Sequence, residues 1–247
     1  MKNKTARTAV RWGLWGVACV TVLLSGIAQR RPLTPQEVFA NFQQAYAKLH
    51  AIQARFEEAT VIAGERRTAK GEIIFQKPNL LRQAYLDPND PLVTAQLIVV
   101  DGENSWSYTP WLNQVTRKRL NPKTAQEILP GAGPNFEKLP ENYDLSLLSD
   151  EAAAKRNMYH LEIRPKPTAQ TPVVQEKLEV WIRAEDWIPV QIAYTNEAEE
   201  VTTVITLTQV DLNAQPSPET FQFVPPPGVE VITITDSSVA EGEGGQE

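Results

Sequence analysis

Cysteine and histidine are almost absent from this sequence of 247 residues. Cys19 is the single cysteine, so no disulfide bond can form within the chain. His50 and His160 are far apart in the sequence, which leaves poor material for a metal site or a catalytic triad built on histidine. The sequence also lacks a Gly-x-Ser-x-Gly elbow and a Gly-x-x-x-x-Gly-Lys phosphate loop. We therefore predict that the protein is not an enzyme and binds no metal and no cofactor.

Acidic residues are plentiful, but their arrangement does not suggest acid/base chemistry. Glu57-Glu58 and Glu199-Glu200 are adjacent pairs that we assign to edge or turn positions, and neighbours in a strand point to opposite faces. His160 is expected on the polar face of its strand, at the surface. The net charge is −6 and no basic block follows the N-terminal segment, which argues against a nucleic-acid partner.

The N-terminal residues are typical of a targeting segment. Lysines and arginines at positions 2, 4, 7 and 11 precede the apolar run Trp12–Ile27, and Gly26-Ile27-Ala28 fits a small-x-small cleavage site. We predict a signal peptide over residues 1–28, and export. An uncleaved anchor helix is the alternative, although the apolar run is shorter than the ~20 residues that span a bilayer. Lipidation of Cys19 is disfavoured because the usual aliphatic residue three places earlier is missing.

The remaining chain predicts one helix followed by many strands. Thr34-Pro35-Gln36-Glu37 is a capping box with proline at the first helical position. Apolar residues then recur on one face as far as Leu49. From Ile52 onward short β-rich segments alternate with turn residues, and the clearest hairpin signal is Asp101-Gly102. Further strands are predicted at 159–163, 178–182, 188–194, 201–210 and 221–224, with helical stretches at 121–129 and 145–148 and a disordered acidic tail over 236–247.

This order of elements predicts an α+β protein with one antiparallel sheet of nine or ten strands. Such a sheet must pair with a second layer or curl toward a barrel to protect its edges. Several strands between Gly71 and Leu120 carry apolar residues on both faces, so they must be covered twice or enclose something. Together with an aromatic helix stripe in an exported protein, this predicts a cavity for an apolar ligand.

Three segments resemble the LolA family of periplasmic carriers of outer-membrane lipoproteins. Gly71–Asn79 (Gly-Glu-Ile-Ile-Phe-Gln-Lys-Pro-Asn) is similar to the family's Gly-x-hydrophobic-Trp-x-Lys-Arg-Pro strand. Leu97–Gly102, with Trp106-Ser107-Tyr108 and Gln114-Val115-Thr116 after it, is similar to the family's Asp-Gly hairpin and the strand beyond. Phe221–Val229 resembles its Phe-x-Phe-x-Pro-Pro-x-Gly-Val ending. The match runs in order from Thr34 to about Ile232, which predicts a carrier domain over residues 29–235.

The resemblance implies a strongly curved, incomplete antiparallel β-barrel, with helices as a lid over its concave apolar face. It implies a monomeric periplasmic carrier that takes the acyl chains of lipoproteins from an inner-membrane ABC transporter and passes them to an outer-membrane acceptor. On this basis the acyl-chain cavity would be lined by Ile73, Phe75, Leu81, Tyr85, Ile98, Val100, Trp106 and Tyr108. The lid would present Phe39, Phe42, Tyr46 and Leu49.

The sequence departs from the family pattern at two positions. The arginine that latches the family's lid is Lys77 here, which keeps the charge but loses the planar fork. We expect Lys77 to reach carbonyl groups of the lid, and the alternative is an exposed lysine at a strand end. A tryptophan of the family falls at Gln83, which places a polar group in the wall. The alternatives are a protein of the same fold that shuttles a lipid or glycolipid or acts as a lipoprotein-binding sensor, and a non-catalytic structural β-sandwich.

Overall fold

The computed structural model describes residues 31–120, 139–167 and 176–234. The chain divides into two compact units, Met1–Pro32 and Leu33–Glu247, and the second is described by itself below. The predicted signal peptide, Cys19, the predicted helix at 121–129 and the acidic tail all lie outside the described residues.

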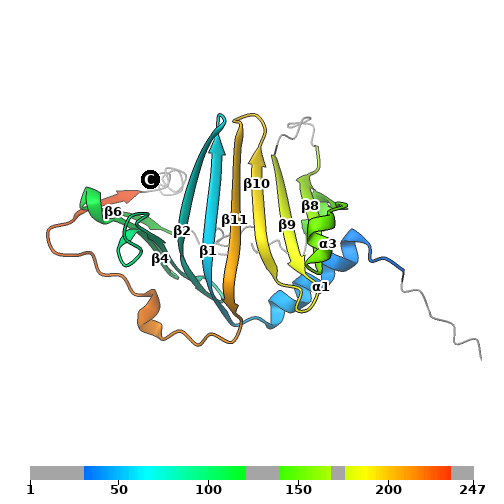
Figure 1. Cartoon of the computed structure of the whole chain (residues 1–247). Coiled ribbons are helices and arrows are strands. Elements are labelled where there is room, and N and C mark those ends of the chain that lie inside the picture. The colour runs from blue at the N-terminus through cyan, green and yellow to red at the C-terminus, as the bar shows by residue number, and fades with distance from the viewer. Residues whose placement is uncertain (1–30, 121–138, 168–175, 235–247) are drawn as a thin grey trace, which may run out of the picture. The chain divides into compact units, whose positions relative to one another are not determined.

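One curved sheet of twelve strands makes up most of the second unit (Figure 1). The strands follow the order β12-β6-β5-β4-β3-β2-β1-β11-β10-β9-β8-β7, and the sheet is open rather than closed, with β12 and β7 at its two ends. All neighbours pair antiparallel except β12, which runs parallel to β6. In chain order the strands are β1 (Ala51–Ile62), β2 (Glu65–Gln76), β3 (Leu80–Leu86), β4 (Thr94–Asp101), β5 (Asn104–Thr109), β6 (Gln114–Arg119), β7 (Tyr143–Leu147), β8 (Met158–Pro165), β9 (Glu176–Arg183), β10 (Pro189–Asn196), β11 (Val201–Asp211) and β12 (Glu230–Ile234).

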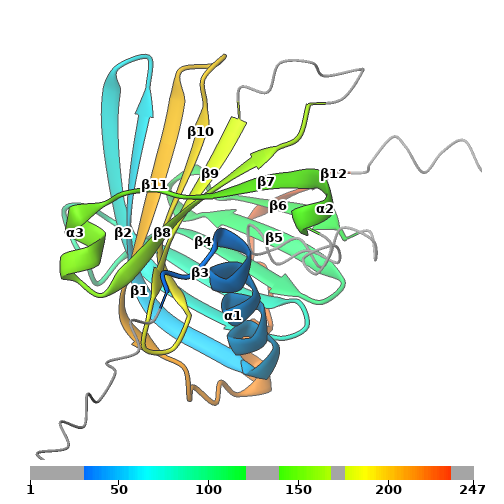
Figure 2. The same cartoon turned by 90° about the vertical axis from the view of Figure 1, so that its right-hand side faces the viewer.

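The main helix, α1 (Pro35–Lys48), lies on the concave face of the sheet (Figure 2). It begins at the predicted capping box: Glu37 N donates to Thr34 Oγ1 over 3.2 Å, and Thr34 N donates to Glu37 Oε2 over 2.8 Å. The other helical elements are short: α2 (Leu139–Asn142), α3 (Glu151–Lys155), η1 (Pro110–Leu112) and η3 (Pro218–Phe221). Among the described residues, no helix combines the length and the apolar character that a membrane crossing requires.

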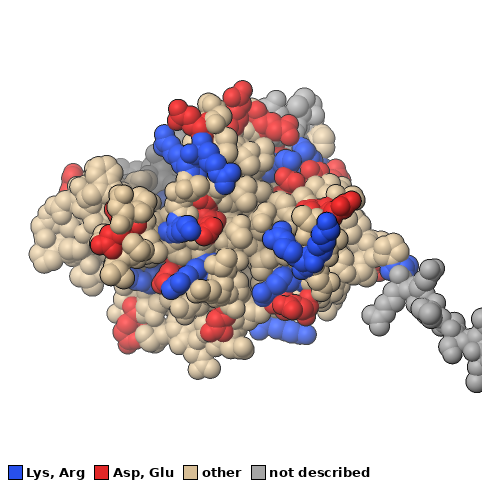
Figure 3. Space-filling view, viewed as in Figure 1, with Lys and Arg blue, Asp and Glu red and all other residues tan. Residues whose placement is uncertain are grey.

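The opposite, convex face of the sheet carries charged side chains of both signs among other residues. Lys, Arg, Asp and Glu intermix over the surface seen in Figure 3. On β1 and β2 they form ion pairs, Arg55–Glu72 at 3.4 Å and Lys70–Glu57 at 2.7 Å. Exposed pairs of this kind add little stability, but they show that this face of the two strands is built for water.

The structure corrects three elements of the sequence prediction. Residues 145–147 do not form a helical turn, because they belong to β7. Leu145 and Leu147 point to the same face of this strand and pack in the cluster that contains the apolar residues of α1. Residues 151–155 form α3, a helix absent from the sequence prediction; the Asp150 carboxylate caps it and accepts from Ala153 N over 2.9 Å. Residues 221–224 form no strand, because the 3₁₀ turn η3 and an extended segment occupy that region, and β12 follows instead. The described strands form one sheet and not two packed ones, so the β-sandwich alternative is wrong.

Candidate functional site

An apolar wall crosses the concave face where β1, β2, β3 and β4 run side by side. Ile52 pairs with Phe75, Phe75 with Leu81, and Leu81 with Val100, so these four side chains form one continuous row. Phe75 is 2% exposed and Val100 is 4% exposed. Ile73 and Ile98 share the same face two residues away and are half-buried. Five of the eight residues predicted to line a cavity therefore stand together in this wall. A sixth, Tyr85, lies on the same face, where polar side chains adjoin the wall.

Helix α1 contacts this wall and a second apolar cluster at the same time. Its residues Val38, Phe39 and Phe42 are buried against β7, β8 and β9, in a cluster completed by Leu145, Leu161, Ile163, Val180 and Ile182. Its C-terminal half packs Tyr46, with Leu49 just beyond the helix, against the row Ile52–Phe75–Leu81–Val100. Edge-on ring contacts connect Phe39 to Phe42 and Phe42 to Tyr46, with centroid separations of 6.1 and 6.3 Å. All four predicted lid residues thus face the sheet.

Lys77 contacts the C-terminal end of α1. Its ammonium group donates hydrogen bonds to the carbonyl oxygens of Tyr46 and Ala47, the second over 3.3 Å, and lies 4.2 Å from the Tyr46 ring centroid. The last carbonyls of a helix lack intrahelical donors and carry the negative end of the helix dipole, so a cation is favoured there. Partial burial lowers the pKa of Lys77. These are the contacts that the sequence leads us to expect at the strand end.

Trp106 and Tyr108 do not share a face with the other six predicted cavity residues. They pair with Val99 and Leu97, whose side chains point to the convex side, and Phe223 covers both rings at 5.7 and 5.9 Å between centroids. The segment after η3 therefore closes a separate apolar layer over β4 and β5. These two aromatic residues pack this outer layer and stand apart from the wall.

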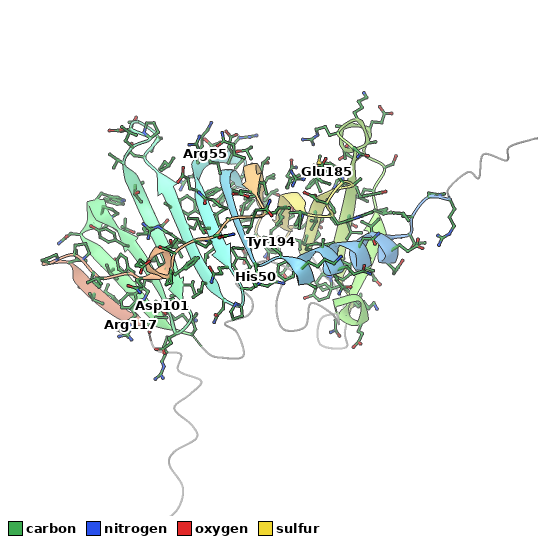
Figure 4. The ribbon with its side chains drawn as sticks, turned by 90° about the horizontal axis from the view of Figure 1, so that it is seen from below. His50, Arg55, Asp101, Arg117, Glu185 and Tyr194 are labelled. Atoms are coloured by element: carbon green, nitrogen blue, oxygen red, sulfur yellow. The ribbon has the colours of Figure 1, made fainter. Side chains whose placement is uncertain are left out.

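Asp101 fixes the position of Trp106 in that outer layer. Its carboxylate accepts hydrogen bonds from the Trp106 indole over 2.8 Å and from the backbone of Asn104 over 2.7 Å. Burial opposes ionisation of Asp101, but these hydrogen bonds outweigh it and hold its pKa below the usual value. Arg117, labelled with Asp101 in Figure 4, lies over the Trp106 ring, with 5.1 Å from its guanidinium carbon to the centroid, and donates to Asn104 Oδ1 over 2.9 Å. The Asp-Gly motif of the sequence thus stabilises the hairpin between β4 and β5.

A polar group interrupts the concave face next to the apolar wall. Tyr85 donates a hydrogen bond to Glu58 Oε2 over 3.0 Å and accepts one from Gln83 Nε2 over 3.0 Å. Burial, followed by the neighbouring Glu58 charge and the hydrogen bond to it, raises the pKa of Tyr85 strongly, so the hydroxyl keeps its proton. Glu58 lies in the middle of β1, a central strand, and not at an edge or turn as predicted. Its neighbours in space therefore could not be read from the sequence.

His160 is also placed differently from the sequence prediction, because its side chain is only 10% exposed. It stacks on Trp181, with 3.9 Å between ring centroids, and its ring nitrogens lie 3.0 Å from Asp150 and 3.2 Å from Glu179. Neither contact has the geometry of a hydrogen bond. Within the part of the chain that the structure describes, no three His, Cys, Asp or Glu side chains are grouped to hold a metal ion.

A hollow of about 450 Å³ lies beside α1, where the helix passes the connection between β9 and β10. Asn41, Gln44 and Lys48 line it from the helix, and Asp186 and Trp187 line it from the connection. The helix is therefore not sealed along this side. The site as a whole is an apolar concavity, filled by one helix whose C-terminal end is held by polar contacts.

Comparison with known proteins identifies relatives of the chain. The family model described as outer membrane lipoprotein carrier protein LolA matches residues 47–224, which is more than half of the chain. An outer-membrane lipoprotein carrier protein of Nitrosospira multiformis is 30% identical over 169 residues, covering 68% of this chain and 73% of that protein. An uncharacterized protein of Methanocaldococcus jannaschii is 26% identical over 214 residues, which are 87% of this chain but only 58% of that relative.

Among solved structures, an uncharacterized conserved protein from Thermus thermophilus aligns with a TM-score of 0.48 and 11% identity, covering 81% of this chain and 98% of its own. Overlap at this level supports no argument about function.

Proposed function

The chain belongs to the LolA family of outer-membrane lipoprotein carrier proteins, and we propose that it binds the acyl chains of lipoproteins in the concavity that α1 now fills. In this proposal α1 is a lid and Lys77 is its latch. The chain is exported by the N-terminal segment, shuttles its cargo through the periplasm as a monomer, and works with an inner-membrane transporter and an outer-membrane acceptor. The family supports these steps; the geometry of the site supports the binding.

One observation carries the proposal: the aromatic stripe of α1 occupies the concave face while a hollow remains along its side. Burying an acyl chain stabilises the complex by about 0.8 kcal/mol per CH₂ group. A helix that fills the empty cavity keeps these side chains from water until cargo competes for the same surface. Binding and release then need no chemical step.

We expect a naphthalene-sulfonate dye to bind the folded protein and to be displaced by a triacylated lipopeptide. Ile73→Asn should weaken dye binding several-fold, because it places an amide in the wall. Ile74→Asn is the matched control: it changes the neighbouring half-buried isoleucine of β2, which points to the convex face. Fluorescence titration measures both variants, after circular dichroism has established that they are folded.

Dye binding that the lipopeptide leaves unchanged, or equal weakening by the two isoleucine variants, would contradict the proposal. Mass spectrometry of molecules that co-purify with the exported protein then tests the cargo directly. Lipid-modified peptides are the expected finding, and a sample free of acylated molecules at every stage of purification counts against a carrier.

Lys77 variants should change how easily the cavity loads. Lys77→Leu removes the hydrogen bonds to Tyr46 and Ala47, so the helix lifts more easily and the lipopeptide binds about fivefold tighter, or about 1 kcal/mol. Transfer of cargo to an acceptor should become slower, because the lost hydrogen bonds no longer draw the helix back over the wall. Lys77→Arg should strengthen closure, because the planar guanidinium can hold both carbonyls in a fixed fork, and should lower the affinity by a similar factor.

Lys70→Leu provides the control for these variants. Lys70 lies on β2, the strand that Lys77 directly follows, is exposed on the convex face, and pairs with Glu57 rather than with the helix. We expect it to leave lipopeptide affinity within twofold of the wild-type value. If Lys77→Leu and Lys70→Leu have the same small effect, then Lys77 is not a latch.

A further inference from the structure

The polar group on the concave face adjoins the acyl-chain wall without a break. The side chains of Leu81, Gln83 and Tyr85 lie on one face of β3, so this face changes from apolar to polar along a single strand. Glu58 continues the polar region on β1, and the hydroxyls of Thr60 and Thr203 follow it, 3.1 Å apart. An acyl chain on the wall would therefore bring its head group to these residues.

The polar group presents acceptors to a ligand. Tyr85 uses its only proton on Glu58, and Gln83 uses one of its two amide hydrogens on Tyr85, which leaves a single amide N–H as a donor. Glu58 Oε1 has only a long contact of 3.5 Å with Thr60, and Gln83 Oε1 has no partner among the described residues. Acceptors therefore predominate among the atoms with free capacity: a carboxylate oxygen and an amide oxygen, which bind N–H or O–H groups, stand against one amide hydrogen of Gln83.

The charge of this region disfavours an anionic head group. Glu58 contacts hydroxyls and no cation within the described residues. Arg67 and Glu65 lie farther out on the same face, toward the hairpin of β1 and β2, where both are exposed and their charges offset each other. A phosphate beside Glu58 would place two like charges close together, partly shielded from water.

The group is also held in place before any ligand arrives. Phe56, which is 1% exposed, packs edge-on against Tyr85 with 5.0 Å between ring centroids. Gly71 stands between them in the register, paired with both, and leaves the space that the Phe56 ring occupies. Hydrogen-bonding groups that are fixed in this way discriminate between ligands at little entropic cost.

From this placement we infer that the site selects amphiphiles whose first polar layer after the acyl chains donates hydrogen bonds and carries no negative charge. This inference rests on the proposed acyl-chain site. Two sources share the chemistry: the amide groups of an acylated peptide N-terminus and the hydroxyl groups of a glycosylated diacylglycerol. Glu58 and Gln83 are the residues that would accept hydrogen bonds from these head groups.

Three ligands with equal acyl chains test the inference by displacement of the dye: a triacylated lipopeptide without charged side chains, a monoglycosyl diacylglycerol, and phosphatidylglycerol. We expect at least one of the first two to bind ten or more times tighter than phosphatidylglycerol. Glu58→Gln should reduce that ratio to threefold or less, mainly by improving phosphatidylglycerol. Glu57→Gln, the adjacent change on the convex face, should leave the ratio unchanged.

The outcomes separate the two proposals. If none of the three ligands displaces the dye, the acyl-chain site itself is wrong. If all three bind equally, or if phosphatidylglycerol binds best, the site stands and the inference about the head group is overturned. Whichever of the first two ligands binds tighter identifies the source of the donors. A ratio that Glu58→Gln and Glu57→Gln change alike also overturns the inference.

Discussion

A disulfide bond between α1 and β7 is expected to abolish ligand uptake, and its reduction is expected to restore it. Phe42 and Leu145 are buried in the same cluster, and backbone Cα atoms of α1 and β7 approach within 8 Å. Cysteines at these two positions, in a Cys19→Ser background, would hold the helix in the concavity. The dye and the lipopeptide then have no wall to bind, because the Tyr46 side of the helix still covers Ile52 and Phe75.

The measurement is lipopeptide binding before and after reduction, with the extent of disulfide formation determined by mass spectrometry. Each single cysteine variant controls for the loss of a large side chain, which by itself removes packing from the cluster. We expect a drop in affinity of at least a hundredfold in the oxidised double variant. Equal uptake in both redox states, at full disulfide formation, would show that α1 is a fixed part of the wall and that cargo binds elsewhere.

The parts of the fold that the sequence predicts well depend on local chemistry. The start of α1 follows from the reciprocal bonds of Thr34 and Glu37, which need only a few neighbouring residues. The contact of Lys77 with helix-end carbonyls follows from an ammonium group at the end of an apolar strand, where an unpaired charge is costly. Such requirements are met within a short stretch, so a single sequence reveals them.

The parts that the sequence predicts poorly depend on which distant segments meet. Trp106 and Tyr108 look like cavity residues because they are two aromatic side chains on one face of β5 in a segment that resembles the family, but the ring of Phe223 covers them from the convex side. Alternation along a strand divides residues into two faces without telling which face is concave. His160 looks exposed for a similar reason, since its cover is Trp181 on the neighbouring strand. The tertiary contacts decide these cases.

The polar group on the concave face combines both situations. Gln83 stands out in the sequence as a polar residue in an apolar wall. Its partners do not, because Tyr85 and Glu58 are brought together by the pairing of β3 with β2 and of β2 with β1. A single sequence thus reveals the unusual polar residue in the wall, but not the residues that form hydrogen bonds with it.

Gly71 links the fold to this group, and replacing it should have the largest effect on stability. A Cβ atom at this position would lie 2.1 Å from the carbonyl oxygen of Ala84 and 2.4 Å from the Phe56 ring. Its backbone φ is not in the left-handed region, so the requirement is for space. We expect Gly71→Ala to cost about 3 kcal/mol or more, at the upper end of what overpacking costs, as measured by chemical denaturation.

Gly64→Ala is the control for this prediction, because Gly64 has a φ of +82° and no atom within 4 Å of its would-be Cβ. Backbone strain alone should cost about 1 kcal/mol there. A penalty at Gly71→Ala no larger than this would mean that β2 and β3 can separate enough to admit a side chain. A Phe56→Leu background should recover only a small part of the Gly71→Ala loss, since the closest atom belongs to the β3 backbone and cannot turn away.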